Sequence, residues 1–214
     1  MSVDLNPAKA RIFRIAHVDC VPWILRHGLH CKSSSTQDPH YVNIGSTELI
    51  GKRATKTVPI PPGGMLSDYV PFYFTPWSIM MLNIHTGYGG ITRRANKDIV
   101  IFVSSIHRLH ELELPFVFTN QHAYAIDTEF YSTPGDLKGI DWPLLQSRNF
   151  KTDDDDPGKQ LRYQAEALVH RRVPRRALLG IGCHDDSVRQ KLESLIAEAG
   201  LTLTVKTTPS WYFR

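Results

Sequence analysis

The sequence is poor in cysteine and lacks long hydrophobic runs. Its 214 residues include three cysteines, Cys20, Cys31 and Cys183, and none belongs to a CxxC pair. Such an odd, scattered set predicts neither a disulfide framework nor a structural zinc site. The apolar runs 78–82 and 99–103 are too short to cross a bilayer, and no basic segment followed by an apolar one begins the chain. We therefore expect a reduced, cytoplasmic protein without a membrane segment or a bound metal.

The chain also has little excess of charge of either sign. The 25 Lys and Arg exceed the 21 Asp and Glu by only +4, which permits a polyanionic partner without requiring one. Hydrophobic residues make up 42% of the chain, enough for a substantial core. The length predicts a single domain over residues 1–214.

The common nucleotide-binding and nucleophile motifs are missing too. The glycine-rich segments 87–90 (GYGG) and 180–183 (GIGC) do not fit GxGxxG, and neither GxxxxGK[ST] nor GxSxG occurs. The Rossmann, P-loop and α/β-hydrolase interpretations therefore have no fingerprint. The spacing of His27, His30 and Cys31 matches no common metal-ligand set.

What is present is a series of short strands and few helices. We expect helices over 19–27, 77–85 and 187–199 (the last capped by Ser187), and strands over 69–75, 98–104, 114–119, 163–169, 178–183 and 201–207. Residues 8–17 are expected to start as a helix and continue as a short strand, and Pro71 indicates an edge strand or a bulge. Because strands outnumber helices and do not alternate with them, the α+β class is favoured.

The segment 120–160 has no clear periodicity. A stretch of this length without structure is unusual in a compact domain and is often functional. It contains His122, Tyr124, Phe130 and Tyr131. These rings either stack on an unpaired base or form a satellite hydrophobic cluster.

Several charged residues allow both a functional and a structural interpretation. Glu166 lies in an apolar strand, where a carboxylate is costly unless it is paired or used in chemistry; it could equally face solvent from a half-exposed strand. Taken alone, His17 is a core or cap residue and Arg53 a solvated loop residue. The basic run 170–176 and the pair Arg93-Arg94 either bind phosphates or keep the surface soluble.

Read together and in order, the chain resembles the DarT family of DNA ADP-ribosyltransferase toxins. The segments that carry the resemblance are IFRIAHVDCVPWILRHGLHC (12–31), YVNIGSTELIGKRATKTVPIPPGGMLSDYVPFYFTPWSIMMLNIHTG (41–87), LPFVFTNQHAY (114–124), DWPLLQSRNF (141–150), RYQAEALVH (162–170) and WYF (211–213). The visible departure is the arginine-rich run that follows Glu166, which bears on DNA contacts.

The resemblance implies an ADP-ribosyltransferase fold, with a split, mainly antiparallel sheet and surrounding helices around an NAD cleft. It also implies transfer of ADP-ribose from NAD, a co-substrate, to a base in single-stranded DNA, most often N3 of thymine. The implied partner is a DarG-type macrodomain antitoxin that removes the mark. Alternatives are a guanine, RNA or protein acceptor, or an idle nucleic-acid-binding module, although intact Glu166, His17 and Arg53 argue against idleness.

Residue by residue, the resemblance implies Glu166 and Arg53 as catalytic residues. The implied cofactor-binding set is His17, Val18, Asp19, Gly28, Tyr41, Asn43 and Arg53, within and around an NAD-binding element over 38–56. A substrate-presenting loop over 119–165 contains His122 and Tyr124, implied to bind the base. Glu166 would stabilise positive charge on the ribose. Whether Arg53 acts as a base or stabilises a deprotonated thymine stays open, although arginine is normally protonated.

Overall fold

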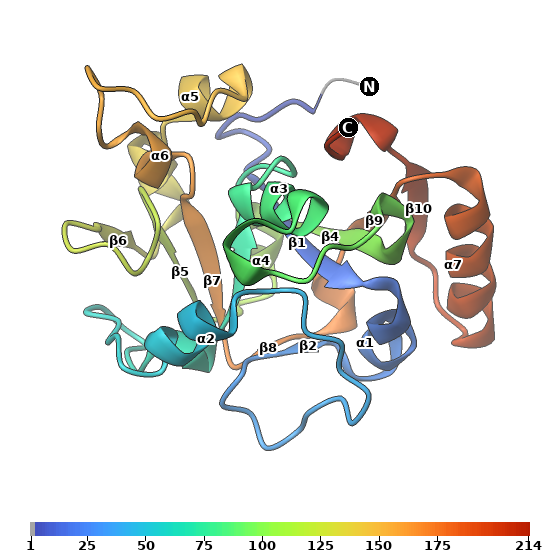
Figure 1. Cartoon of the computed structure of the whole chain (residues 1–214). Coiled ribbons are helices and arrows are strands. Elements are labelled where there is room, and N and C mark those ends of the chain that lie inside the picture. Colours follow the sequence, from blue (N-terminus) through green and yellow to red (C-terminus); the bar gives the residue numbers. More distant parts are fainter. Residues whose placement is uncertain (1–2) are drawn as a thin grey trace.

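The computed structural model describes residues 3–214 and is built on one eight-stranded sheet (Figure 1). The strand order is β10-β9-β4-β1-β3-β7-β5-β6. The strands are β1 (Arg11–His17), β3 (Tyr69–Tyr73), β4 (Ile99–Ser105), β5 (Phe116–Thr119), β6 (Phe130–Tyr131), β7 (Glu166–His170), β9 (Gly180–Cys183) and β10 (Thr204–Thr207). Only the β9–β10 pair is parallel among the described pairs. The α+β prediction, with a mainly antiparallel sheet, is confirmed.

A second, two-stranded sheet and short helices surround the main sheet. The small sheet pairs β2 (Leu29–His30) with β8 (Arg172–Val173). In Figure 1, α7 flanks the β9–β10 end of the sheet, and α5 and α6 lie toward the β5–β6 end. The helices are α1 (Val21–His27), α2 (Thr47–Arg53), α3 (Ile79–Thr86), α4 (Ile106–Glu111), α5 (Trp142–Ser147), α6 (Lys159–Arg162) and α7 (Asp186–Glu198).

The core is built around the β1–β4 ladder. These strands pair along their full length, from Arg11 opposite Ser105 to His17 opposite Ile99. The sequence of β4, IVIFVSS, is continuously apolar at its start rather than alternating, and six of its seven residues are buried. This pattern is typical of a strand covered on both faces.

The structure corrects several sequence-based boundaries. Residues 11–17 are entirely strand, without the expected helical start. Asp185, rather than Ser187, caps α7, because its side chain accepts a hydrogen bond from the Val188 amide at 3.0 Å. The predicted strand 163–169 begins only at Glu166. The segment 120–160 is not structureless, since it contains β6, a 3-10 helix (Pro134–Gly139), α5 and the start of α6.

Pro71 lies in a central strand, so the prediction of an edge strand is wrong. Its strand β3 pairs fully with β7 but meets β1 at a single position, Phe13 opposite Tyr73. The carbonyl of Pro71 accepts a hydrogen bond from Arg14 Nη1 at 2.8 Å instead of a β1 backbone amide. Because proline has no N–H to donate, it is tolerated here only where the two strands diverge. The expected split of the sheet thus lies between β1 and β3.

The arginine-rich run after β7 is used in part to cap a helix. Arg172 Nε donates to the His27 carbonyl at 3.0 Å, and Arg175 Nη1 donates to the Leu25 carbonyl at 3.2 Å. Both carbonyls belong to the last turn of α1, where backbone acceptors lack helical partners and a positive charge is favourable. These two arginines therefore have a structural role.

Across residues 3–214, no helix is long and apolar enough to span a membrane.

Candidate active site

Glu166 is the first residue of β7 and lies opposite Tyr73 of β3. Only 2% of it is exposed. Its Oε1 accepts a hydrogen bond from the Ala123 amide at 3.0 Å, and its Oε2 accepts one from Arg53 Nη1 at 2.8 Å. The solvent-facing alternative for Glu166 is wrong, and the carboxylate is buried and paired.

The surroundings of Glu166 favour its ionised form. Burial alone would raise the pKa of the carboxyl group. The Arg53 guanidinium, the nearby His122 and the Ala123 amide outweigh that effect and hold the pKa of Glu166 below its ordinary value. A negative charge is therefore maintained inside the protein at neutral pH.

Arg53 ends helix α2 rather than lying in a solvated loop. The helix starts at Ser46, whose side chain accepts a hydrogen bond from the Leu49 amide at 3.3 Å. The Arg53 side chain is only 11% exposed. Its Nη2 is buried and has no hydrogen-bond partner among residues 3–214. A buried nitrogen left free in this way points to a ligand acceptor beside it.

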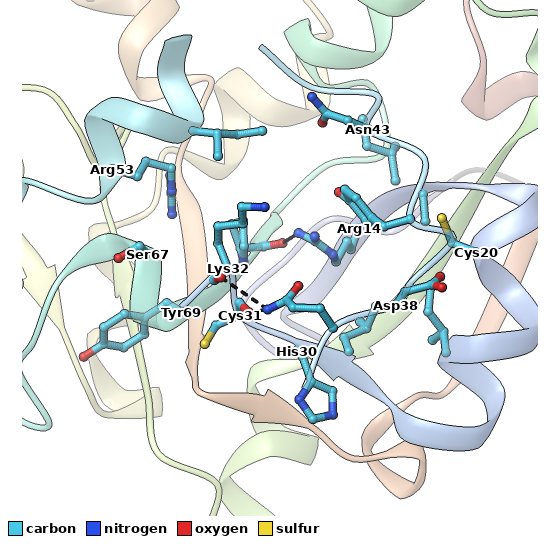
Figure 2. A pocket seen from close by; sticks show the side chains of 18 of the residues that line it. Arg14, Cys20, His30, Cys31, Lys32, Asp38, Asn43, Arg53, Ser67 and Tyr69 are labelled. Atoms are coloured by element: carbon cyan, nitrogen blue, oxygen red, sulfur yellow. Dashed lines mark hydrogen bonds between the residues drawn. The ribbon is translucent and has the colours of Figure 1, made fainter. Parts of the chain in front are cut away.

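Two connected cavities open where β1 and β3 diverge. The larger has a volume of about 280 Å³ and the smaller about 140 Å³. The residues that line both are Arg14, Ile15, Tyr41, Asn43, Ile50, Arg53 and Pro71. Figure 2 shows Arg14 and Arg53 extending into the larger cavity. Glu166 and His122 line only the smaller one. Arg53 therefore stands at the junction of the two cavities.

Arg14 is a site residue that the sequence analysis missed. It lines both cavities, and within the described chain no carboxylate forms an ion pair with it. Its Nε is also buried without a partner among those residues, and burial lowers the pKa of the guanidinium from its ordinary value. The available signal was an arginine in the apolar strand IFRIA. A partly buried cation without a counter-charge is costly, so this position is suited to an anionic ligand.

Besides Arg53, two of the predicted cofactor-binding residues, Tyr41 and Asn43, line both cavities. Tyr41 is 51% exposed at the rim. The Asn43 side chain forms an Asx-type turn in which its Oδ1 accepts a hydrogen bond from the Gly45 amide at 3.1 Å. Both residues belong to the predicted element 38–56.

The remaining predicted cofactor-binding residues lie beside the cavities. His17, Val18, Asp19 and Gly28 are not among the lining residues. His17 is buried, and its Nδ1 accepts a hydrogen bond from the Asp19 amide at 3.2 Å, which caps the 3-10 helix Val18–Cys20. Gly28 ends α1 with a φ of 80°, and a Cβ there would lie 2.4 Å from the Val173 carbonyl oxygen. The structure thus gives His17 and Gly28 local structural roles.

The two predicted base-binding residues separate in the structure. His122 lines the smaller cavity with Glu166, and its Nδ1 accepts a hydrogen bond from the Tyr124 amide at 3.2 Å. Tyr124 and Phe130 instead pack on a small hydrophobic cluster composed of Val58, Leu66, Tyr69, Val117, Ala123 and Leu168. For these two aromatics, the alternative of a satellite cluster is confirmed.

Residues 3–214 contain no group of three or more His, Cys, Asp or Glu side chains arranged to hold a metal ion. The three cysteines are buried and unbridged.

Comparison with known proteins gives consistent matches over nearly the whole chain. The family profile described as "ssDNA thymidine ADP-ribosyltransferase, DarT" matches residues 13–213. A DNA ADP-ribosyl transferase of Escherichia coli O127:H6 (strain E2348/69 / EPEC) is 51% identical over 212 residues, which cover 99% of this chain and 97% of that protein.

Solved structures agree. Thermus sp. 2.9 DarT in complex with ADP-ribosylated ssDNA superposes with a TM-score of 0.89 at 28% identity, over 97% of this chain and 98% of that one. The same Thermus protein in complex with NAD+ gives a TM-score of 0.83 at 27% identity, over 96% and 98% of the two chains. This chain therefore belongs to the DarT family of single-stranded DNA thymidine ADP-ribosyltransferases.

Proposed function

We propose that this protein transfers the ADP-ribose group of NAD to N3 of a thymine in single-stranded DNA and releases nicotinamide. The observation that carries the proposal is the buried Glu166–Arg53 pair, which lies where the two cavities meet. Glu166 borders the smaller cavity and Arg53 borders both. One charged pair can therefore act on a donor in one cavity and an acceptor in the other.

The residues of the larger cavity fit a dinucleotide with a pyrophosphate. Two guanidinium groups, those of Arg14 and Arg53, face this space, and each has a buried nitrogen without a partner within residues 3–214. Arginine donors match phosphate oxygens well in geometry and charge. In this proposal Arg14 binds the pyrophosphate, and Tyr41 and Asn43 contact the ligand from the rim.

When bound, NAD supplies a ribose on which positive charge develops as nicotinamide leaves. The Glu166 carboxylate is ionised and fixed by two hydrogen bonds, so it can stabilise that charge without reorganising. Arg53 holds the carboxylate in place through the hydrogen bond from its Nη1. N3 of the thymine forms a bond to the ribose carbon as the bond between that carbon and nicotinamide breaks. The Glu166 carboxylate, which borders the smaller cavity, accepts the N3 proton, and the Arg53 cation stabilises the negative charge that develops on the base.

The smaller cavity fits the acceptor base. Its lining combines Tyr73, Met80 and His122 with Glu166, an apolar and aromatic wall beside one carboxylate. Access to N3 requires that the Watson–Crick edge be free, because a paired base would first have to be flipped out. Single-stranded DNA meets that requirement directly.

Two further expectations accompany this proposal. A DarG-type macrodomain antitoxin is expected to remove the mark, and the cytoplasm is the expected compartment. Incubation of the labelled DNA with such a macrodomain tests the first. Retention of the full label after that incubation would argue against the partner.

The central experiment uses labelled NAD and single-stranded oligonucleotides that each lack one base type, with duplex DNA, RNA and a bystander protein alongside. We expect label only where thymine is present, and mass spectrometry of the digested product should place ADP-ribose on N3. Label that follows guanine, RNA or protein would replace the proposed acceptor. Absence of any label with wild-type protein would overturn the proposal.

A further inference from the structure

The outer wall of the larger cavity is an irregular segment. Residues 31–46, here called the cavity wall, connect β2 to α2 and contain neither helix nor strand. Several of them line the larger cavity, namely Cys31, Lys32, Gln37, Asp38, Tyr41 and Asn43. Because regular hydrogen-bond ladders do not hold this wall, other contacts must fix its position.

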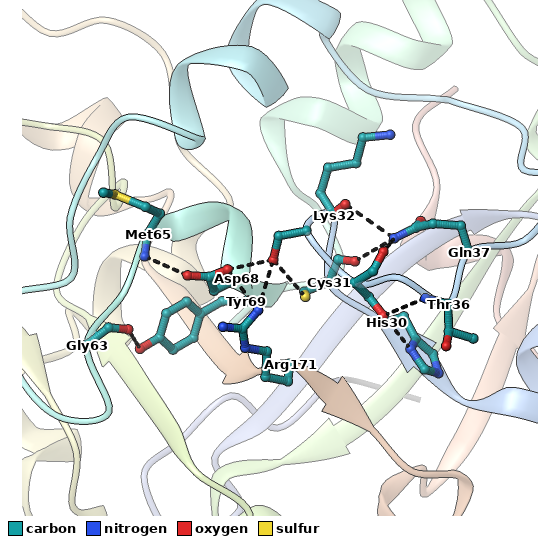
Figure 3. A network of polar contacts seen from close by, with 12 residues as sticks. His30, Cys31, Lys32, Thr36, Gln37, Gly63, Met65, Asp68, Tyr69 and Arg171 are labelled. Carbon is teal, nitrogen blue, oxygen red and sulfur yellow. Dashed lines mark hydrogen bonds and ion pairs between the residues drawn. The ribbon is translucent and has the colours of Figure 1, made fainter.

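Side-chain contacts that converge on Asp68 fix the first part of the wall (Figure 3). Asp68 Oδ1 accepts hydrogen bonds from Ser33 Oγ at 2.5 Å and from Arg171 Nη1 at 3.1 Å. Its Oδ2 accepts a hydrogen bond from the Met65 amide at 2.9 Å. The Asp68 side chain is 14% exposed, and the Ser33 hydroxyl, the Met65 amide and Arg171 lower its pKa. We call Ser33, Asp68 and Arg171 the Asp68 joint.

Backbone hydrogen bonds at the joint connect the same segments of the chain. The Arg171 amide donates to the Asp68 carbonyl at 2.8 Å, and the Arg171 carbonyl accepts the Cys31 amide at 2.9 Å. The Ser33 amide donates to the Ser67 carbonyl at 3.2 Å. Arg171 makes these contacts with a φ of 62°, a left-handed conformation unfavourable for a side chain that is not glycine. Such a conformation persists only where its surroundings enforce it, and often next to a functional site.

The Asp68 joint lies next to the larger cavity without lining it through Asp68 itself. Asp68 is not among the lining residues, whereas its neighbours Ser67 and Tyr69 line the larger cavity, as do Cys31 and Lys32 beside Ser33. Asp68 therefore connects three chain segments, the wall, the turn before β3 and the β7–β8 turn, without reaching the ligand space. A change at Asp68 can alter the wall without altering Glu166 or Arg53.

We propose that Asp68 is a positioning residue for the dinucleotide, because it holds the cavity wall in the conformation that binds NAD. This inference rests on the proposed function, which assigns NAD to the larger cavity. Loss of the joint lowers the fraction of molecules whose wall is in place, and apparent affinity falls by the same factor. The chemical step at Glu166 is unchanged once NAD is bound.

The test compares Asp68→Ala and Ser33→Ala with wild-type protein in NAD titrations of single-stranded DNA labelling. If about one molecule in ten keeps the wall in place, KM for NAD rises about tenfold in Asp68→Ala. We expect a smaller rise in Ser33→Ala, which keeps the Asp68–Arg171 pair, and a kcat near the wild-type value in both. Because both variants break the same joint, KM of the double variant should not exceed that of Asp68→Ala.

Asp186→Ala is the matched control. Asp186 Oδ1 also accepts hydrogen bonds from a hydroxyl, Thr207 Oγ1 at 2.6 Å, and from an arginine, Arg189 Nε at 3.1 Å. It lies at the start of α7 and lines neither cavity. Its replacement should lower the Tm but leave KM for NAD unchanged.

The outcomes separate this inference from the proposed function. An unchanged KM in folded Asp68→Ala, a fall in kcat alone, or an equal KM rise in Asp186→Ala would overturn the role of Asp68. If Asp68→Ala does not fold, Ser33→Ala alone decides, and a wild-type KM in it would refute the inference. If wild-type protein does not label DNA, calorimetric titration with NAD still measures the NAD affinity of each variant. Weaker NAD binding by the variants together with no DNA labelling by wild type supports the joint and refutes the proposed function.

Discussion

Arg53 Nη1 lies 2.8 Å from Glu166 Oε2, although the two residues are 113 positions apart in the sequence. The last residue of one helix thus meets the first residue of a central strand. Each side chain explains the burial of the other, since an ionised group inside a protein requires a counter-charge or hydrogen bonds. The pair proposed to carry out transfer therefore also contributes to the stability of the fold.

Replacement of Glu166 by Gln should abolish efficient transfer but keep the NAD site. Gln preserves the shape and loses the charge that stabilises the ribose, so we expect kcat to fall by about 10²-fold or more. Calorimetry should show NAD affinity close to wild type. The control is Glu48→Gln, which alters an exposed pair with Lys52. Wild-type turnover in Glu166→Gln would contradict the assignment.

Arg53→Ala should lose both activity and stability. It leaves Glu166 buried without its cation, and breaking a buried ion pair in this way costs about 3–5 kcal/mol of unfolding free energy. Chemical denaturation measures that loss. Lys52→Ala, at the adjacent exposed position, should leave the midpoint of unfolding almost unchanged. If both variants unfolded at the same denaturant concentration, the pair would contribute nothing to stability.

Arg14→Gln should weaken NAD binding more than it slows chemistry. The variant removes a cation from both cavities but leaves the Glu166–Arg53 contact in place. We expect KM for NAD to rise about tenfold or more, as for the loss of a hydrogen bond to a charged group. Arg11→Gln, on the same strand but away from the cavity lining, is the control. An equal KM in the two variants would exclude Arg14 from the pyrophosphate site.

The contribution of Glu166 to stability should depend on pH in a defined direction. Its pKa in the folded protein lies below the ordinary value of 4.5, so ionisation favours the folded state. The contribution is complete above about pH 4.5 and is lost as the pH falls through the folded-state pKa. The Tm difference between wild type and Glu166→Gln should therefore be constant near neutrality and shrink in acid. A difference that grew on acidification would mean that burial dominates this pKa.

Labelling should strongly favour single-stranded DNA over a fully paired duplex. Flipping a paired thymine costs a few kcal/mol, and a net charge of +4 offers little backbone attraction to offset it. A gel assay with one thymine-containing strand, alone and annealed to its complement, measures the ratio. Added salt should weaken labelling of the single strand. Equal labelling of both forms would show that pairing does not restrict access.

Part of this architecture is readable from the sequence. The continuous apolar run of β4 predicts a buried strand, and the glycine after α1 predicts its end. The site is harder to predict, because a lone Arg53 within a polar stretch gives no sign that it is buried. Its partner lies on a distant strand, and only tertiary packing brings the two together. Arg14 was missed for the same reason, since the divergence of β1 from β3 creates the cavity it lines.

Pro71 makes the cavity unsuitable for a polypeptide ligand, because of its backbone rather than its side chain. Two strands that diverge inside a sheet expose an internal edge, and such an edge invites β-augmentation by any extended peptide. Along β3, strand pairing at this edge is blocked at Pro71. Proline has no amide N–H to donate, and the Pro71 carbonyl already accepts a hydrogen bond from Arg14. A polypeptide entering the gap would find no ladder to extend there. A nucleotide needs none, because it binds through its phosphates and rings.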